Sequence, residues 1–206
     1  MIRGGVRCEH RVMLTSLDRI RYAGVIVGPL AFITSWAVAG ASTAGYSPIR
    51  DPISDLAAVS APTRPLMNVG FAVFTVAVSA AAWPLRRLIG TPGSVAMGIN
   101  AAMSAGVALS PLGASAGGDR LHQVVSGAGY LALAALGPSA APALARHSRT
   151  LAGASVGVGV VSLACLAASL LDDDRSGFWQ RAGITATDGW LIAIGILALT
   201  TADEER

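Results

Sequence analysis

Charged residues are scarce in this sequence, and lysine is absent from it. Only 13% of the 206 residues are charged and 53% are hydrophobic, whereas about a quarter of a soluble domain is charged. A soluble chain of this length needs more polar surface than that. Because lysine is absent, all 15 basic residues are arginines. This composition excludes an ordinary cytosolic globular protein, a disordered chain and a nucleic-acid-binding module, so we expect no nucleic acid among the partners.

Cysteine and histidine are also too few for a disulfide framework or a zinc site. Cys8 lies in a basic N-terminal segment and Cys165 in an apolar run, so we do not expect them to meet. Zinc catalysis needs three protein ligands, and His122 is the one histidine near predicted acidic side chains. The run Asp172–Asp174 is better interpreted as a solvated helix end than as a cation site. We therefore expect no metal and no cofactor.

Six apolar runs are long enough to cross a membrane. A bilayer core about 30 Å thick needs roughly 20 residues of helix. No run contains arginine, and the last contains the one acid, Asp188. Because backbone polar groups in lipid must be satisfied within the segment, the runs are predicted to be helices. They are Tyr22–Thr43, Leu66–Leu85, Ser94–Leu112, Gln123–Leu144, Leu151–Leu171 and Ala182–Thr201.

The sequence thus predicts an all-α fold, a polytopic integral membrane protein with a six-transmembrane-helix bundle. The links between the runs are too short for a second domain. We expect a basic N-terminal segment over residues 1–21, one transmembrane domain over residues 22–201 and a short tail over residues 202–206.

The arginines predict how the bundle is oriented. Cytoplasmic links of membrane proteins carry the excess of basic residues. With six helices, the side that holds both termini has ten arginines and the other side has five, so we expect both termini to be cytoplasmic in a multi-pass protein of the cell membrane. The ten are Arg3, Arg7, Arg11, Arg19, Arg21, Arg86, Arg87, Arg146, Arg149 and Arg206.

The first run has a second interpretation. A basic start, an apolar stretch and the sequence Ala37-Val38-Ala39 also fit a cleaved signal peptide, although its basic region would be about twenty residues long. Cleavage would leave an odd number of helices. Two GxxxG pairs, Gly24/Gly28 and Gly153/Gly157, favour close helix contacts, but glycine is common throughout this chain.

The first polar cluster lies in the long link after the first run, within Arg50-Asp51-Pro52-Ile53-Ser54-Asp55. Asp before Pro predicts a helix with Asp51 as N-cap and Pro52 in the first helical position. Asp51 and Asp55 would then share one face, with Ser54 beside them. Two interpretations remain open: an interfacial helix whose acids favour the helix dipole, or contacts to a substrate or ion.

The second cluster opens the fourth predicted helix. Asp119 and His122 are three positions apart and can touch. Held in one tautomer by that carboxylate, His122 would act as an acid or base near neutral pH. Alternatively, Asp119 is an N-cap and His122 bonds to a neighbour. Ser126 and Tyr130 continue the polar stripe into the membrane.

The third cluster opens the last predicted helix. Arg181, Thr185 and Asp188 fall on one face, and Asp188 should lie about 10 Å deeper than Arg181. A carboxyl group at that depth is neutral, paired with arginine or in a wet cavity. Trp190 follows on the same helix.

Four segments of the chain resemble a known family. They are Tyr46–Ala58 (YSPIRDPISDLAA), Pro65–Phe71 (PLMNVGF), the Asp119/His122 pair and Gly177–Arg181 (GFWQR). These segments are similar to the bacterial and archaeal membrane family catalogued as domain of unknown function 998, over nearly the whole chain beyond the N-terminal segment. The family is understood as a six-helix bundle without an established activity. The resemblance therefore implies the topology and an outward placement of Asp51, Ser54, Asp55, His122 and Arg181, but no reaction.

Three functions fit these clusters. The first is an outward-facing Asp/His/Arg pocket that binds a membrane lipid, isoprenoid or other lipophilic small molecule and acts on it as a metal-independent acid/base enzyme. Its chemistry would be either prenyl or terpene cyclisation by a protonated acid, or hydrolysis of a lipid ester or amide by His122–Asp119 with Ser54 or Ser126. The second is a non-catalytic lipid-binding, sensing or assembly protein, locked by ion pairs such as Asp55–Arg181 and Asp119–Arg50. The third, transport of protons or a small solute, is disfavoured because no chain of ionisable groups reaches the cytoplasmic face.

For the enzyme we assign two sets of residues. Proton transfer is assigned to Asp55, His122 and Asp188, and substrate contacts are assigned to Asp51, Ser54, Asp119, Arg181 and Trp190. The sequence predicts neither the ligand nor the oligomeric state.

Overall fold

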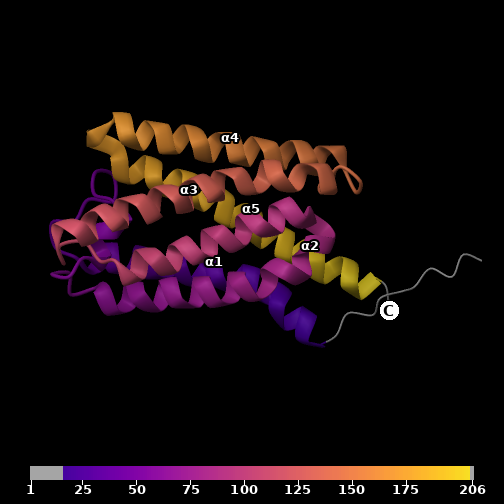
Figure 1. Ribbon diagram of the computed structural model, residues 1–206, viewed down its shortest axis with the longest axis horizontal. Coiled ribbons are helices and arrows are strands. Elements are labelled where there is room, and N and C mark those ends of the chain that lie inside the picture. Colours follow the sequence, from indigo (N-terminus) through magenta and orange to yellow (C-terminus); the bar gives the residue numbers. More distant parts are fainter. Residues whose placement is uncertain (1–15, 205–206) are drawn as a thin grey trace, which may run out of the picture.

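The structure, a computed structural model, is all-helical, as the apolar runs predict. It describes residues 16–204, and side chains over residues 16–201; most of the predicted basic segment, with Cys8, lies outside the described residues, as do the last two residues of the tail. The elements in chain order are α1 (Ser16–Ser42), η1 (Ile53–Ala57), α2 (Arg64–Leu109), α3 (Ala116–Leu144), α4 (Arg149–Leu171), η2 (Asp173–Arg175) and α5 (Ser176–Glu204) (Figure 1).

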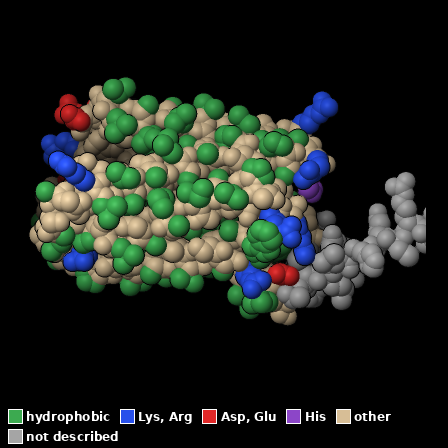
Figure 2. Space-filling model, viewed as in Figure 1, with side chains coloured by type: hydrophobic (Ala, Val, Ile, Leu, Met, Phe, Trp, Pro, Cys, Tyr) green, Lys and Arg blue, Asp and Glu red, His purple; other side chains and the backbone are tan. Residues whose placement is uncertain are grey.

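Within the described residues, five helices are long and apolar enough to cross a membrane. Large apolar side chains lie exposed along their lengths, among them Val76, Val160 and Leu163. Figure 2 shows that the charged side chains on this face gather at the two ends of the molecule, with an uncharged band between them. An apolar surface of this extent is typical of a face covered by hydrocarbon or by another protein.

Helix α2 reverses its direction at Gly90. The φ of 73° and ψ of 167° at Gly90 lie outside the helical region, in a conformation that glycine adopts at low cost. Across this turn, Ser94 Oγ donates to the carbonyl oxygen of Ala82 at 2.6 Å, and Thr75 Oγ1 donates to that of Ala101 at 3.3 Å. The two halves of α2 therefore run antiparallel and side by side (Figure 1). They contain the second predicted run and the third as far as Leu109, where α2 ends three residues before the predicted run does.

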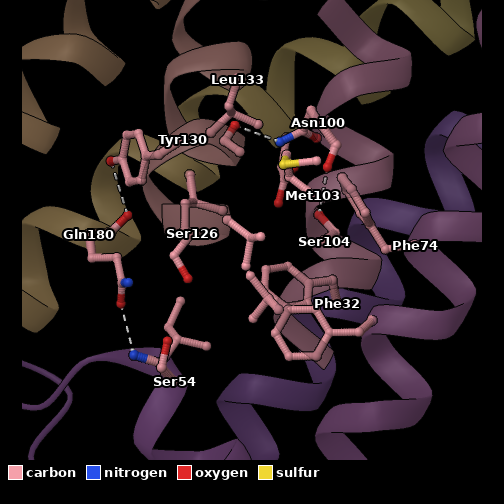
Figure 3. Close-up of a pocket in the computed structure, with 17 residues that line it drawn as sticks. Phe32, Ser54, Phe74, Asn100, Met103, Ser104, Ser126, Tyr130, Leu133 and Gln180 are labelled. Atoms are coloured by element: carbon pink, nitrogen blue, oxygen red, sulfur yellow. Dashed lines mark hydrogen bonds between the residues drawn. The ribbon is translucent and has the colours of Figure 1, made fainter. Parts of the chain in front are cut away.

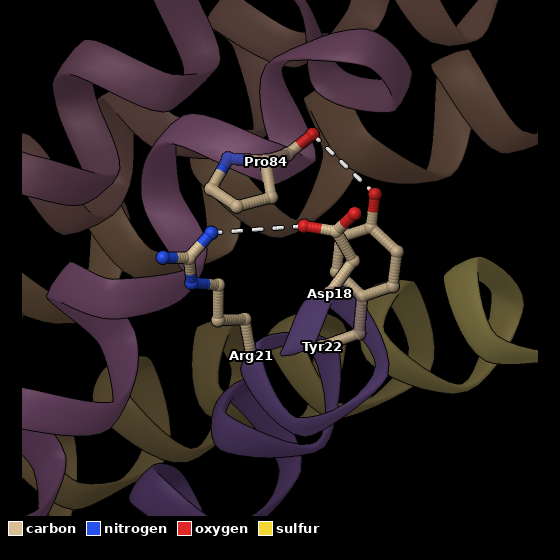
Figure 4. Close-up of polar contacts among 4 residues, drawn as sticks. All are labelled: Asp18, Arg21, Tyr22 and Pro84. Atoms are coloured by element: carbon tan, nitrogen blue, oxygen red, sulfur yellow. Dashed lines mark hydrogen bonds and ion pairs between the residues drawn. The ribbon is translucent and has the colours of Figure 1, made fainter. Parts of the chain in front are cut away.

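Helix α1 begins at Ser16, before the predicted first run, and its first turns are tied to α2 (Figure 4). Arg21 Nη1 lies 3.7 Å from Asp18 Oδ1, and Tyr22 Oη donates to the carbonyl oxygen of Pro84 at 3.5 Å. The first and last described residues lie at this same end of the bundle (Figure 1).

Helices approach closely at several glycines. Of the two predicted GxxxG pairs, one lies at such a contact and the other does not. A Cβ on Gly24 would lie 2.8 Å from the Ala77 carbonyl oxygen, so the first pair serves the α1–α2 contact. Gly153 and Gly157 face no atom within 4 Å in the described part of the chain. Helices α3 and α4 instead approach at Gly137, where a Cβ would lie 2.1 Å from a backbone oxygen of α4.

The link between α1 and α2, residues 43–63, covers one end of the bundle, and we call it the cap segment. Val59 N–H donates to the carbonyl oxygen of Leu112 at 2.9 Å, which ties the cap segment to the turn after α2. Phe178 N–H donates to that of Ile49 at 2.8 Å, which ties it to the start of α5. Backbone hydrogen bonds to two neighbouring elements therefore fix the cap segment in place.

Two helix starts differ from the predictions. Asp51 is not an N-cap: η1 begins only at Ile53, and the Asp51 carboxylate instead accepts from Ser47 N–H at 2.7 Å. Asp119 is not an N-cap either, because α3 begins earlier, with Ser115 Oγ accepting from Gly118 N–H. In both cases the acidic side chain closes the loop that precedes the helix.

Candidate functional site

A cavity of about 90 Å³ lies between α1, α2, α3 and α5, beneath η1 of the cap segment. It is large enough for several water molecules. One part of its wall is aromatic, with Phe32 packed against Phe71 and Phe74 at ring-centroid distances of 5.0 and 5.8 Å. Figure 3 shows polar side chains from several helices along the remaining wall. The polar lining residues are Ser54, Asn100, Ser104, Ser126, Tyr130, Gln180 and Asp188.

Several polar atoms in this wall have no hydrogen-bond partner among the described residues. They are Asn100 Oδ1, Ser126 Oγ and both carboxylate oxygens of Asp188. Asp188 is fully buried and Asn100 is 6% exposed. The Asn100 amide nitrogen donates to the Gly129 carbonyl oxygen at 3.0 Å, which leaves an acceptor toward the cavity. An unpartnered buried polar group costs about 1–3 kcal/mol, so a hydrogen-bonding occupant of the cavity would be stabilised by these atoms.

The cavity runs from the cap segment into the bundle. At the cap end, Gln180 Oε1 accepts from Ile53 N–H at 2.8 Å, which joins α5 to η1 (Figure 3). Asp188 lies two helical turns further along α5, about 12 Å deeper at the helical rise of 1.5 Å per residue. The carboxyl group therefore lies within the apolar part of α5.

His122 lies behind the cavity wall and bonds to Ser54, which lines the cavity. The imidazole is 4% exposed. Its Nδ1 lies 2.7 Å from the Ser110 carbonyl oxygen and its Nε2 lies 2.9 Å from Ser54 Oγ. Because a carbonyl oxygen only accepts, Nδ1 carries the hydrogen, and in the neutral ring Nε2 accepts from the Ser54 hydroxyl group. The network thus assigns a single tautomer.

The predicted pairing of His122 with Asp119 is wrong. The Asp119 carboxylate accepts from Gly113 N–H at 2.8 Å, at the turn that precedes α3, and a backbone carbonyl orients the ring instead. Neither Asp119 nor His122 lines the cavity.

Arg181 hydrogen-bonds to the cap segment and does not line the cavity. Its guanidinium group is buried, and Nη1 donates to the carbonyl oxygens of Pro48, Asp51 and Gly177 at 2.8–2.9 Å. Nη2 donates to Tyr46 Oη. A planar guanidinium group suits such multiple contacts. The ion pairs Asp55–Arg181 and Asp119–Arg50, suggested by the non-catalytic alternative, are absent from the described residues; Arg181 instead donates to carbonyl oxygens and to the Tyr46 hydroxyl group.

Asp55 lies in η1 and is exposed, on the outer side of the cap segment. Partial desolvation raises the pKa of its carboxyl group, and the nearby Asp51 carboxylate raises this pKa further. His122 and Arg181 lower it. These four groups therefore lie within electrostatic reach of one another at the capped end, although Asp51 and Asp55 do not line the cavity.

Trp190 is buried and bonds to a neighbouring helix. Its indole Nε1 donates to Ser155 Oγ of α4 at 2.8 Å. Of the residues assigned from the sequence, the structure thus brings Ser54 and Asp188 into one cavity, with His122 behind Ser54. The remaining five, Asp51, Asp55, Asp119, Arg181 and Trp190, lie outside the lining.

Sequence reasoning did not assign Asn100, Gln180 or the phenylalanine cluster to the site. A signal for them exists: Asn100 is an amide within an apolar run, and the cluster uses three of only four phenylalanines in the chain. Neither signal shows which wall a residue joins, because that depends on how distant helices pack.

The all-helical fold, the five apolar helices and the uncharged band define the class: a helical membrane protein. The chain belongs to the family described as "Protein of unknown function (DUF998)", whose sequence profile matches residues 26–197, as the four segments predicted. No curated protein and no solved structure matches the chain.

Proposed function

We propose that the protein crosses the cell membrane six times, with the two halves of α2 as separate spans. The turn at Gly90 and the antiparallel bonds across it support this count. The cap segment and the turn between α2 and α3 then lie on one side of the membrane. The start of α1 and the end of α5 lie on the other. The excess of arginine on the side of the termini favours a cytoplasmic location for both.

We further propose that the cavity binds the polar end of a lipophilic small molecule whose polar group donates hydrogen bonds. One observation supports this proposal: three side chains line the same cavity with buried polar atoms that lack partners, and all of these atoms can accept. The carboxyl group of Asp188 can ionise when an ammonium group binds beside it, which favours a cationic donor. The aromatic faces of Phe32, Phe71 and Phe74 add a second attraction for an ammonium group.

The test compares two probes of equal length and opposite charge, n-octylamine and n-octanoate, on the full chain in a non-ionic detergent. Octylamine should raise the temperature of thermal unfolding with saturation, since a ligand that binds only the folded state stabilises it. Octanoate should not. The Asp188→Asn variant should lose the octylamine response, and Asp173→Asn, which removes an exposed acid outside the cavity, should keep it. Equal responses of wild type and Asp188→Asn would refute the proposal.

A second candidate is the non-catalytic lock of the cap segment. The contacts of Arg181 support it, because its four hydrogen bonds go to residues of the cap segment and to Gly177 of α5 itself. This candidate accounts for Arg181, Asp51 and Asp119. It leaves the unpartnered atoms of Asn100, Ser126 and Asp188 without an explanation, so the binding function is favoured.

A further inference from the structure

Ser54 and His122 have the geometry of a nucleophile and its base. Ser54 Oγ lies 2.9 Å from His122 Nε2, and His122 Nδ1–H is held by the Ser110 carbonyl oxygen at 2.7 Å. A serine, a base and a third group that orients the base form the arrangement used in nucleophilic catalysis. A backbone carbonyl here occupies the place that a carboxylate has in serine hydrolases.

Ser54 differs from the other serines that bond within this bundle. Ser35, Ser110 and Ser155 each donate to the carbonyl oxygen four residues earlier in their own helix. Such a bond satisfies a hydroxyl group without activating it. Ser54 instead donates to an imidazole nitrogen, a basic acceptor that can take the proton, and it lines the cavity.

A donor for the developing negative charge lies beside this pair. Ile53 N–H can only donate, so the Gln180 atom that faces it is the carbonyl oxygen. The Gln180 amino group is left free of that bond, in a side chain that lines the cavity next to η1 (Figure 3). N–H groups placed near a reacting carbonyl stabilise its oxyanion.

We propose that Ser54 and His122 form a catalytic dyad that hydrolyses a short-chain acyl ester of an amino alcohol, whose ammonium group donates to the unpartnered acceptors of the cavity. Ser54 Oγ attacks the ester carbonyl carbon, and His122 Nε2 takes the hydroxyl proton. The bond between this carbon and the leaving alcohol oxygen then breaks, and His122 returns the proton to the alcohol. Water attacks the acyl-serine with His122 again as base, which releases the carboxylic acid and restores Ser54. This inference rests on the proposed function, because the ester must enter the same cavity.

The test uses a rhodamine-tagged fluorophosphonate on the full chain in detergent. Serine attack forms a P–O bond and breaks the P–F bond, releasing fluoride, so a stable label marks an activated serine. Peptide mapping should place the label on Ser54 and not on exposed Ser60. Ser54→Ala should abolish labelling, and the matched Ser60→Ala variant in the same cap segment should retain it. His122→Asn should slow labelling about 100-fold, the usual contribution of a positioned base.

Each outcome decides between the two proposals. A wild type that responds to octylamine but carries no label on Ser54 overturns the dyad and leaves the cavity standing. A label on Ser54 without an octylamine response overturns the cavity's preference for donors and leaves the dyad standing. Equal labelling rates in wild type and His122→Asn, or a label spread equally over Ser54 and Ser60, overturn the dyad. If His122→Asn does not fold, site-selective labelling of the wild type still decides.

Discussion

Two ionisable side chains of α5, Arg181 and Asp188, are buried, and their surroundings differ. Arg181 donates to three carbonyl oxygens and a phenol oxygen, and of its nitrogens only Nε lacks a partner among the described residues. Asp188 meets no partner among the described residues. A buried polar group without a hydrogen-bond partner is costly. Arg181 therefore has a structural role in holding the cap segment, whereas Asp188 is available to bind a ligand in the cavity.

Arg181→Met should loosen the cap segment. The substitution keeps an apolar stem but removes all four hydrogen bonds of the guanidinium group. Hydrogen bonds to charged groups contribute about 1.5–3 kcal/mol each, and with partial compensation by water we expect unfolding to become about 3 kcal/mol easier. Chemical unfolding in detergent, with protease cleavage within residues 43–63, measures this. Exposed Arg175→Met is the control, and equal losses in both variants would contradict the role of Arg181.

Asp55 should make stability depend on pH. Its folded-state pKa is raised above the unfolded value, so the folded state binds more protons between the two values. Stability therefore falls as pH rises through this window, and the ionised carboxylate destabilises the folded state at pH 7. Asp55→Asn should match or exceed the wild-type unfolding temperature at pH 7 and lose this advantage at pH 4. An unfolding temperature below wild type at pH 7 would contradict the sign.

At the scale of elements, the contact between α3 and α4 depends on glycines, which have no side chain. A Cβ at Gly137 would approach Ser155 O to 2.1 Å, and one at Gly159 would approach Pro138 Cδ to 2.4 Å. Both contacts are shorter than atoms allow, so these helices reach their separation only with glycine at both positions. The same principle governs small-residue contacts between membrane helices in general.

Gly137→Ala should therefore force α3 and α4 apart. Overpacking of this kind costs about 1–3 kcal/mol, which a lower unfolding temperature in detergent would report. Gly157→Ala is the matched control, because a Cβ there meets no atom within 4 Å. A control that destabilises as strongly as Gly137→Ala would show that glycine flexibility, and not the close contact, is what matters.

The helices themselves follow from the sequence, but their ends and partners do not. Long apolar runs predict helices because lipid leaves no other way to satisfy the backbone. The predicted helix start with Asp51 as N-cap is wrong, because the Asp51 carboxylate accepts from the backbone N–H of Ser47, four residues earlier. Of the two interpretations of His122, the pairing with Asp119 is wrong, and its actual partners, Ser110 and Ser54, reach it only through tertiary packing.

At the scale of the molecule, polar groups are distributed in two places. Most charges lie at the two ends, as Figure 2 shows for one face. The interior holds the polar cavity, which four helices and the cap segment line. The sequence predicts Ser54 and Asp188 as site residues, but it does not predict that they line the same cavity, because that depends on the packing of η1 against α5.

The proposed topology predicts opposite labelling of two ends of the bundle. In a background with Cys8 and Cys165 replaced by serine, Ser60→Cys in the cap segment should react with a membrane-impermeant maleimide added to intact cells. Arg146→Cys, between α3 and α4, should react only after the membrane is permeabilised. Both positions are exposed. Reaction at residue 146 alone in intact cells would reverse the orientation, and reaction at both would contradict six spans.

The most direct measurement of the central claim is native mass spectrometry of octylamine on the protein released from detergent. The account predicts one bound octylamine per chain at saturation, not displaced by octanoate, and a large loss of the bound species in Asp188→Asn. No bound amine, or the same occupancy in wild type and Asp188→Asn, would contradict the claim that the buried acceptors in this cavity bind a hydrogen-bond donor.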